Sequence, residues 1–183
     1  MARRIARLAV FVTVFLLTAG FDQGTKEWAR SLPTTPADCA MADLAAHRCA
    51  GVPQPVIDGF WDWELAKNPG AAFSSFTGGV GTQIILSVIA MVALIVLGVA
   101  AARTRPEERL RRLGYALIAG GALGNLLDRL RDGAVTDFVR WRYHDLKWPI
   151  FNLADAALLI GGALFVIDAA RLYVRDRRAA RAA

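Results

Sequence analysis

Asp155 and Asp137 are the acidic residues best placed to do chemistry. Asp155 lies among alanines in an apolar stretch that contains no basic residue. Because a charge inside a membrane costs a few kcal/mol or more, such a residue needs a partner or a proton and is a candidate functional group. Asp137 follows Gly133, where the chain can turn sharply and bring this carboxylate back over the same region. Two carboxylates that share a proton in a dry pocket can act as general acid and general base, as in aspartic proteases.

Other polar side chains have helical spacings that would bring them to the same depth as this pair. Residues three or four apart lie on one face of a helix, so each set should present its polar groups together. The sets are Asp22 with Lys26, Asn125 with Asp128 and Arg129, and Asn152 with Asp155. Since the opposite ends of the apolar stretches carry only scattered arginines and Asp168, this asymmetry predicts a site at one membrane face.

Other catalytic constellations fit poorly. The chain has four serines and no histidine within an apolar stretch, which argues against a Ser-His hydrolase. His47 and His144 are far apart and no His-Glu-x-x-His pattern occurs, which argues against a zinc site. Gly120, Gly121 and Gly124 lie in an apolar helix without a following Lys-Ser or Lys-Thr, which favours close helix packing over phosphate binding.

The composition is that of a membrane protein. Of 183 residues, 55% are hydrophobic and 21% are charged, with a mean hydropathy of +0.36. This excludes a disordered tail or a nucleic-acid-binding arm. The net charge of +6 comes from arginines in short runs beside apolar stretches, so it indicates membrane topology. We therefore expect no nucleic-acid partner and one membrane domain over residues 1–183.

Four stretches approach the roughly 20 apolar residues that span a bilayer as a helix. They are residues 5–21, 83–102, 113–127 and 150–167. The third is short and rich in glycine, so it can span only if protein shelters its polar end. These stretches predict an all-α membrane protein, a four-transmembrane-helix bundle with a small extracytoplasmic β element.

The distribution of Lys and Arg sets the predicted orientation, because cytoplasmic flanks carry more of them. Arginine runs before residue 8, between residues 103 and 112 and after residue 170 place both termini and the middle loop in the cytoplasm. The first outside loop, 22–82, has four basic and seven acidic residues. The second, 128–149, has five basic residues, for which we expect local partners. A cleaved N-terminal signal is the alternative, but it would put the arginine-rich middle loop and tail on opposite sides.

The outside segments contain two alternating patterns. Residues 60–67 alternate aromatic or aliphatic with polar side chains, which predicts a half-buried strand in a small sheet on the membrane surface, within a β region at about 31–82. Residues 139–144 alternate similarly, which fits either an interfacial aromatic belt or a mobile flap. Cys39 and Cys49 lie in the first outside loop, where a local disulfide is possible.

Five segments together resemble the bacterial lipoprotein signal peptidase family, also called signal peptidase II. They occur in family order across most of the chain, and they are residues 22–26, 68–74, 120–129, 133–138 and 151–155. Two features depart from the family pattern: Pro69 follows Asn68, and the first outside loop is long.

The resemblance implies an aspartic membrane endopeptidase that cleaves diacylglyceryl-modified prolipoproteins just before the lipidated cysteine. It implies a catalytic dyad of Asp137 and Asp155, a structural role for Asp128 and no metal or organic cofactor. It also implies a monomer in the bacterial cytoplasmic membrane, in contact with membrane lipid, with its active site at the extracytoplasmic face. The expected pocket residues are Asn68, Gly121, Asn125, Arg129 and Asn152, supported by Asp22 and Lys26.

Two other classes of function are compatible with a membrane-embedded aspartate. One is a non-enzymatic assembly or binding factor, in which the polar groups only hold helices together. The other is a proton or ion carrier. The polar residues form no relay toward the cytoplasmic end, which argues against a carrier.

Overall fold

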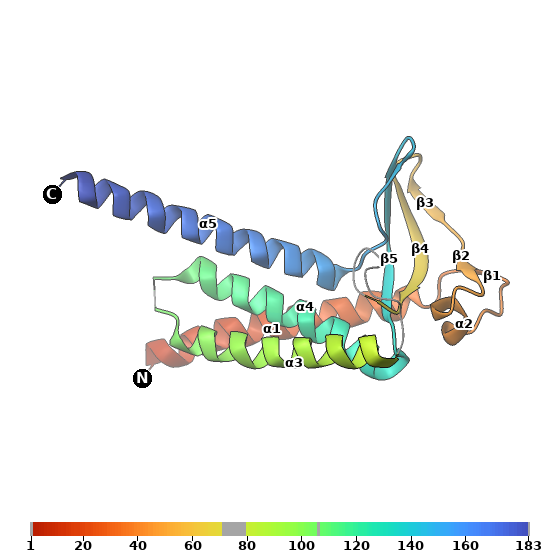
Figure 1. Ribbon diagram of the computed structural model, residues 1–183, viewed down its shortest axis with the longest axis horizontal. Coiled ribbons are helices and arrows are strands. Elements are labelled where there is room, and N and C mark those ends of the chain that lie inside the picture. The colour runs from red at the N-terminus through yellow and green to blue at the C-terminus, as the bar shows by residue number, and fades with distance from the viewer. Residues whose placement is uncertain (1, 71–79, 106, 183) are drawn as a thin grey trace.

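The structure, a computed structural model, describes residues 2–70, 80–105 and 107–182. Four long helices lie side by side, and they are α1 (Ala2–Ala29), α3 (Val80–Arg103), α4 (Arg109–Asp132) and α5 (Leu153–Ala182). A four-stranded antiparallel sheet crosses one end of them, in the order β3 (Gln54–Ile57), β4 (Trp61–Asn68), β5 (Val135–Tyr143) and β6 (Leu146–Lys147). Both chain ends lie at the opposite end of the bundle (Figure 1).

The sheet corrects the predicted all-α class. Strand β4 forms where the alternation predicted it, but its partner β5 comes from the second outside segment. The pairs Trp61 with Trp141 and Lys67 with Thr136 therefore join segments far apart in the sequence. Strands occur between residues 34 and 68, within the β region predicted at about 31–82, and again between residues 135 and 147, while residues 80–82 begin α3.

Within the described residues, three helices are long and apolar enough to cross a membrane, over Leu8–Ala29, Val80–Arg103 and Leu153–Arg175. They contain most of the predicted spans 5–21, 83–102 and 150–167. The last span begins later than predicted, because Phe151 forms a bridge to Val139 on β5 before the helix starts.

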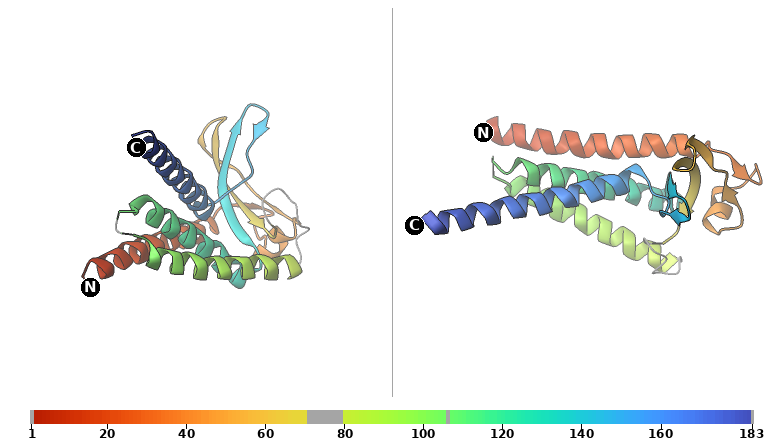
Figure 2. Two further views of the ribbon diagram at one scale, coloured as in Figure 1. Left: turned by 60° about the vertical axis from the view of Figure 1, so that its left-hand side comes forward. Right: turned by 90° about the horizontal axis from the view of Figure 1, so that it is seen from above.

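The fourth predicted span, 113–127, lies within α4, which is not among these apolar helices. Helix α4 contacts each of the other long helices, and in the right-hand view of Figure 2 it lies between α1 and α3. Much of its glycine, alanine and polar surface is buried. A helix sheltered in this way needs less apolar surface than one that faces lipid.

Small residues let the helices approach closely, as the sequence indicated. A Cβ added to Gly121 would lie 2.5 Å from the carbonyl oxygen of Ala154 on α5. One added to Gly120 would lie 2.6 Å from the Thr18 Cβ on α1. The preference for helix packing over a phosphate loop is thus confirmed for these glycines.

Two basic residues of the predicted second outside loop, Arg140 and Arg142, have local partners of the kind expected. Arg140 pairs with Glu64, and Arg142 Nε lies 2.8 Å from Asp62 Oδ2. The Asp62 side chain is buried, although the alternation of β4 placed it on the polar face. The ion pair with Arg142 offsets the cost of burying the Asp62 carboxylate. The register of β4 against β5 shifts further along the strand, between Trp63 and Ala66.

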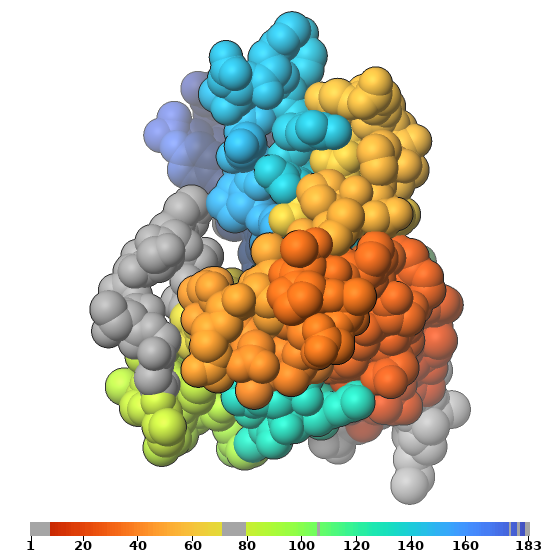
Figure 3. Space-filling model, turned by 90° about the vertical axis from the view of Figure 1, so that its right-hand side faces the viewer, coloured from red at the N-terminus to blue at the C-terminus, as the bar shows by residue number. Residues whose placement is uncertain are grey.

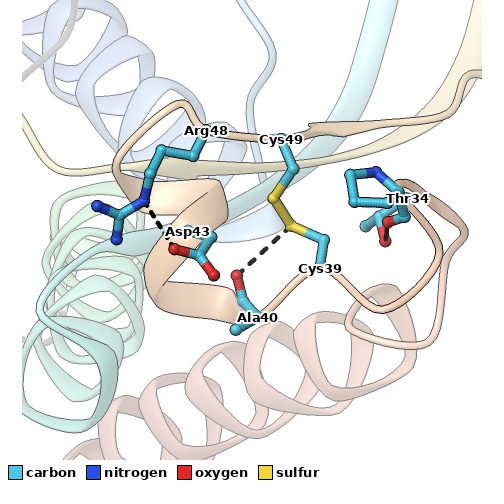
Figure 4. Close-up of a disulfide and its surroundings, with 7 residues drawn as sticks. Thr34, Cys39, Ala40, Asp43, Arg48 and Cys49 are labelled. Carbon is cyan, nitrogen blue, oxygen red and sulfur yellow. Dashed lines mark hydrogen bonds and ion pairs between the residues drawn. A yellow bond between two sulfur atoms is a disulfide. The ribbon is translucent and has the colours of Figure 1, made fainter.

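The segment between α1 and β3 is a lobe closed by a disulfide. It contains α2 (Met41–Ala45) and a two-stranded sheet of β1 (Thr34–Thr35) and β2 (Ala50–Gly51). Figure 3, viewed onto the sheet end, shows this lobe in orange beside the yellow and blue strands. Cys39 and Cys49 are joined, so the pairing that the sequence allowed is present, with the Arg48–Asp43 ion pair beside it (Figure 4).

Gly161 and its neighbour Gly162 provide a matched test of the α4–α5 contact. A Cβ at Gly161 would lie 2.6 Å from Ile118 Cγ1 and 2.9 Å from the Gly114 oxygen, whereas one at Gly162 meets nothing within 4 Å. We expect Gly161→Ala to destabilise the protein by about 1–3 kcal/mol through overpacking. Gly162→Ala should leave stability equal or slightly higher. Thermal unfolding in detergent micelles measures both, and equal midpoints would contradict this packing.

Candidate active site

Two asparagines link the predicted catalytic carboxylates. Asn152 Nδ2 donates to Asp137 Oδ1 at 2.7 Å, and Asn125 Nδ2 donates to Asp155 Oδ1 at 2.9 Å. Asn152 Nδ2 also lies 3.2 Å from Asn125 Oδ1, which joins the two halves. Asp137 is on β5, Asp155 is in the first turn of α5 and Asn125 is on α4. Residues from α4, β5 and the start of α5 therefore meet at the sheet end of the bundle.

The start of α5 places Asn152 and Asp155 by a reciprocal cap. Asn152 Oδ1 accepts from the Asp155 backbone N–H at 3.0 Å, and Asp155 Oδ2 accepts from the Asn152 N–H at 3.2 Å. This is a capping box, which satisfies two N–H groups at a helix start. Just before it, Phe151 exchanges backbone hydrogen bonds with Val139 at 2.8 and 3.1 Å. These bonds hold the start of α5 against the strand that carries Asp137.

The turn into β5 forms as the sequence predicted. Gly133 caps α4 in the left-handed conformation, with φ of 66°, and its N–H donates to the Arg129 carbonyl at 3.0 Å. A positive φ is cheap only for glycine, so the helix ends here and the strand runs back across the bundle. Asp137 is thereby brought to the position where Asn152 contacts it.

Asn68 also reaches the pair, from the end of β4. Its Nδ2 donates to Asp137 Oδ2 at 3.3 Å, and its Oδ1 accepts from the Gly70 N–H at 3.0 Å. Pro69 therefore leaves this contact intact, and its carbonyl accepts from Gln83 on α3. Residues 71–74 of the same predicted motif lie outside the described residues.

Arg129 and Gly121 occupy different surroundings. Half-buried Arg129 donates from Nη1 to the Asn125 carbonyl at 3.2 Å and lines a cleft of about 670 Å³, walled mainly by apolar side chains of α3. Its Nε has no hydrogen-bond partner within the described residues. Gly121 is buried against Ala154 instead, so it lies in the helix contact behind the site.

Asp22 and Lys26 support the site from α1. Lys26 Nζ is fully buried, 2.9 Å from Asp22 Oδ2 and 3.2 Å from Asp128 Oδ2, and it donates to Asn125 Oδ1 at 2.8 Å. Asp22 Oδ1 accepts from the Ala154 N–H at 2.9 Å, in the first turn of α5. One buried ammonium therefore contacts side chains of α1 and α4, and its partner Asp22 extends the cluster to α5.

Sequence reasoning missed a second group of charges next to this one. Arg30 Nη2 lies 3.0 Å from Asp128 Oδ1 and 3.2 Å from Asp132 Oδ2, and Asp132 also pairs with Lys67. Lys67 Nζ donates to Thr136 Oγ1 at 2.9 Å. The spacing of Lys26 and Arg30, four residues apart, indicates that the two side chains share one helix face. In this group the acidic partners of Arg30 and Lys67 lie on another element, so no spacing in the sequence predicts these pairs.

The surroundings of Asp137 favour its neutral form. Its side chain is almost fully buried, and burial together with the nearby charge of Asp155 raises the pKa of Asp137 to about 8. The amide donors of Asn152 and Asn68 act in the opposite direction. Asp137 therefore keeps a proton at neutral pH.

Across residues 2–70, 80–105 and 107–182, no group of three His, Cys, Asp or Glu side chains could hold a metal ion.

Two solved structures that superpose on this chain are described as bacterial membrane enzymes. One, determined by the in meso method at 2.3 Å, superposes with a TM-score of 0.70 and 26% identity over 89% of this chain and 88% of its own. Another, at 1.9 Å, gives a TM-score of 0.69 and 26% identity over 87% and 91%. This chain thus shares its fold with bacterial membrane enzymes.

Sequence relatives identify the family. The profile of the family described as Signal peptidase (SPase) II matches residues 14–171. A lipoprotein signal peptidase of Xanthomonas euvesicatoria pv. vesicatoria is 36% identical over 156 residues, 85% of this chain and 81% of its own length. One from Xylella fastidiosa is 36% identical over 155 residues, 83% of each chain. The chain belongs to the signal peptidase II family of bacterial membrane proteases.

Lys26 offers a test of the buried charge cluster. Lys26→Met leaves the Asp22 and Asp128 carboxylates buried without their shared cation, so we expect a loss of about 3–5 kcal/mol of stability. Arg48→Met is the matched control, because Arg48 pairs with Asp43 in solvent and should change stability little. Thermal unfolding in micelles compares the two, and a Lys26 variant as stable as the control would contradict this role.

Proposed function

We propose that this signal peptidase cleaves by an aspartic mechanism, with Asp137 and Asp155 as the catalytic pair. As a member of its family, the chain removes signal peptides from lipid-modified prolipoproteins, and we place the cleaved bond just before the lipidated cysteine. The observation that carries the proposal is the linkage of the two carboxylates through Asn152 and Asn125, in surroundings that keep one of them protonated.

The two carboxylates differ in their donors, which suggests their roles. Asp155 accepts hydrogen bonds from the Asn152 N–H and the Asn125 amide, and it lies at a helix N-terminus, where negative charge is favoured. We assign it the general base. Asp137 is buried and protonated, and we assign it the general acid.

With these roles, hydrolysis of the peptide bond needs only the substrate, one water molecule and the two carboxylates. The water oxygen bonds to the scissile carbonyl carbon while a water proton passes to Asp155 and Asp137 gives its proton to the carbonyl oxygen. When the intermediate collapses, the C–N bond breaks and the new cysteine amine takes the proton held by Asp155. Asp137 regains its proton from the hydroxyl that becomes the new carbonyl, so the pair returns to its starting state.

Substrate contacts are assigned to polar side chains that lie next to the pair. Arg129, with an unused Nε beside the cleft, and Asn68 are placed to bind the substrate backbone. The apolar α3 wall of that cleft suits the apolar signal segment of the substrate. Gly121, predicted to line the pocket, would act by allowing α5 to approach.

We propose that all four long helices, α4 included, cross the membrane as one monomeric domain surrounded by lipid. At 1.5 Å per residue, the 24 residues of α4 are long enough for this. Arginine-rich segments lie at the end of the bundle that holds both termini, which supports a cytoplasmic position for that end. The aspartate pair would then lie at the extracytoplasmic face.

Removing either catalytic carboxylate tests the mechanism. We expect Asp137→Asn and Asp155→Asn each to reduce cleavage of a lipidated precursor by at least about 10²-fold, because general acid or base catalysis is lost. Both variants should still accumulate in the membrane. Asp43→Asn, on the solvent-exposed lobe, is the control and should cleave normally. Retained cleavage by either catalytic variant would refute the mechanism. Substitutions that disturb folding but leave the turnover of each folded molecule unchanged would favour an assembly factor.

The pH dependence of turnover tests the protonated state of the pair. Since the pKa of Asp137 is raised to about 8, the pair holds its proton below that pH and loses it above. We expect kcat/KM to fall as pH rises through about 8, with an apparent pKa that belongs to the pair. The same proton stabilises the fold fully below pH 3.8, and this contribution is lost as pH rises toward 8. A kcat/KM that stays flat well above pH 8 would contradict the assignment.

A further inference from the structure

Lys67 is a buried charge that the proposed chemistry does not use. It lies on β4 directly before Asn68, and its ammonium is fully buried. That ammonium pairs with Asp132 on α4 and donates to Thr136 Oγ1 on β5 at 2.9 Å. Thr136 directly precedes Asp137, and Lys67 and Thr136 are register partners. Lys67 therefore joins three elements one residue away from both Asn68 and Asp137.

Thr136 is held from two directions. Its N–H donates to Asp128 Oδ2 at 2.7 Å, while its hydroxyl accepts from Lys67. The β4–β5 register shifts between Trp63 and Ala66, and Ala66 is the residue that faces Asp137. The ladder is thus irregular just before the catalytic position. A shift of β5 at this point would break at least one of the two bonds to Thr136.

Stability alone is a weak reason to bury Lys67. Burial lowers the pKa of Lys67, against the opposing effect of its pairing with Asp132. Apolar replacements of a buried ion pair are often equally stable or more so. Catalysis, in contrast, is sensitive to small displacements of a reacting group, and about 1 Å can cost about 10²-fold in rate.

We propose that Lys67 is a positioning residue for Asp137, which acts through Thr136 to hold β5 in register with β4 and keep Asp137 against Asn68 and Asn152. This inference rests on the proposed aspartic mechanism. The Lys67 ammonium contacts Asp132 and Thr136 and acts on Asp137 through its neighbour in the strand, so its effect is on where Asp137 lies.

The test separates position from stability. We expect Lys67→Met to lower kcat by about tenfold with little change in KM. A second variant, K67M/D132L, replaces the ion pair by two apolar side chains and should regain the unfolding midpoint without regaining kcat. Arg30 keeps Asp128 and Glu27 as partners in that variant. Lys147→Met, at an exposed lysine of β6, is the matched control and should keep the wild-type kcat.

Thr136 provides an independent arm. Thr136→Val removes the hydroxyl with little change of shape and should lower kcat to the same extent as Lys67→Met. Because both changes break the same bond, K67M/T136V should show no further loss. A wild-type kcat in K67M/D132L, or losses that multiply in K67M/T136V, would overturn the inference. If Asp137→Asn still cleaves, the aspartic mechanism itself fails, whatever Lys67 does.

Discussion

A charge buried away from water must find its counter-charge inside the protein, and this constraint organises the sheet end of the bundle. Lys26 meets it with Asp22 and Asp128, and it gives its third contact to Asn125. Asp22 in turn accepts an N–H from the first turn of α5. The helix that carries Asp155 is therefore placed by the same interactions that neutralise Lys26. The same bonds hold the helices together and place the side chains of the site, so a change that breaks them affects both.

Local spacing explains which parts of the site could be predicted. Asn152 with Asp155, and Asp22 with Lys26, form contacts within one turn of a helix, and the turn at Gly133 depends on one residue. The pairing of β4 with β5 depends on segments separated by two helices, and no period in either strand specifies its partner. Lys67 and Arg30 were missed for the same reason, because their partners lie on other elements. The start of α5 was misplaced since Phe151, an apolar residue in an apolar run, pairs with a strand.

Hydropathy has a matching weakness at α4. A scale that scores each residue as though it faced lipid undervalues a helix surrounded by protein, where glycine and alanine serve the packing and polar side chains serve the site. The residues that lower the apolarity of α4, Asn125 and Asp128 among them, are those that the proposed chemistry and its support require. A polar, glycine-rich segment between clear spans is thus informative about where function lies.

The bridge between Phe151 and Val139 has a further consequence. It closes residues 139–151 into one loop, and Asp137 and Asp155 lie on the two chain segments that flank the closed end of this loop. Within the described residues, α3 supplies none of the hydrogen bonds to either carboxylate, although it forms most of the cleft wall. Under the proposed binding of the signal segment in this cleft, changes along α3 would alter which precursors bind while the reacting geometry stays constant. Selectivity and turnover number are separable properties in such an enzyme, and each can drift without the other.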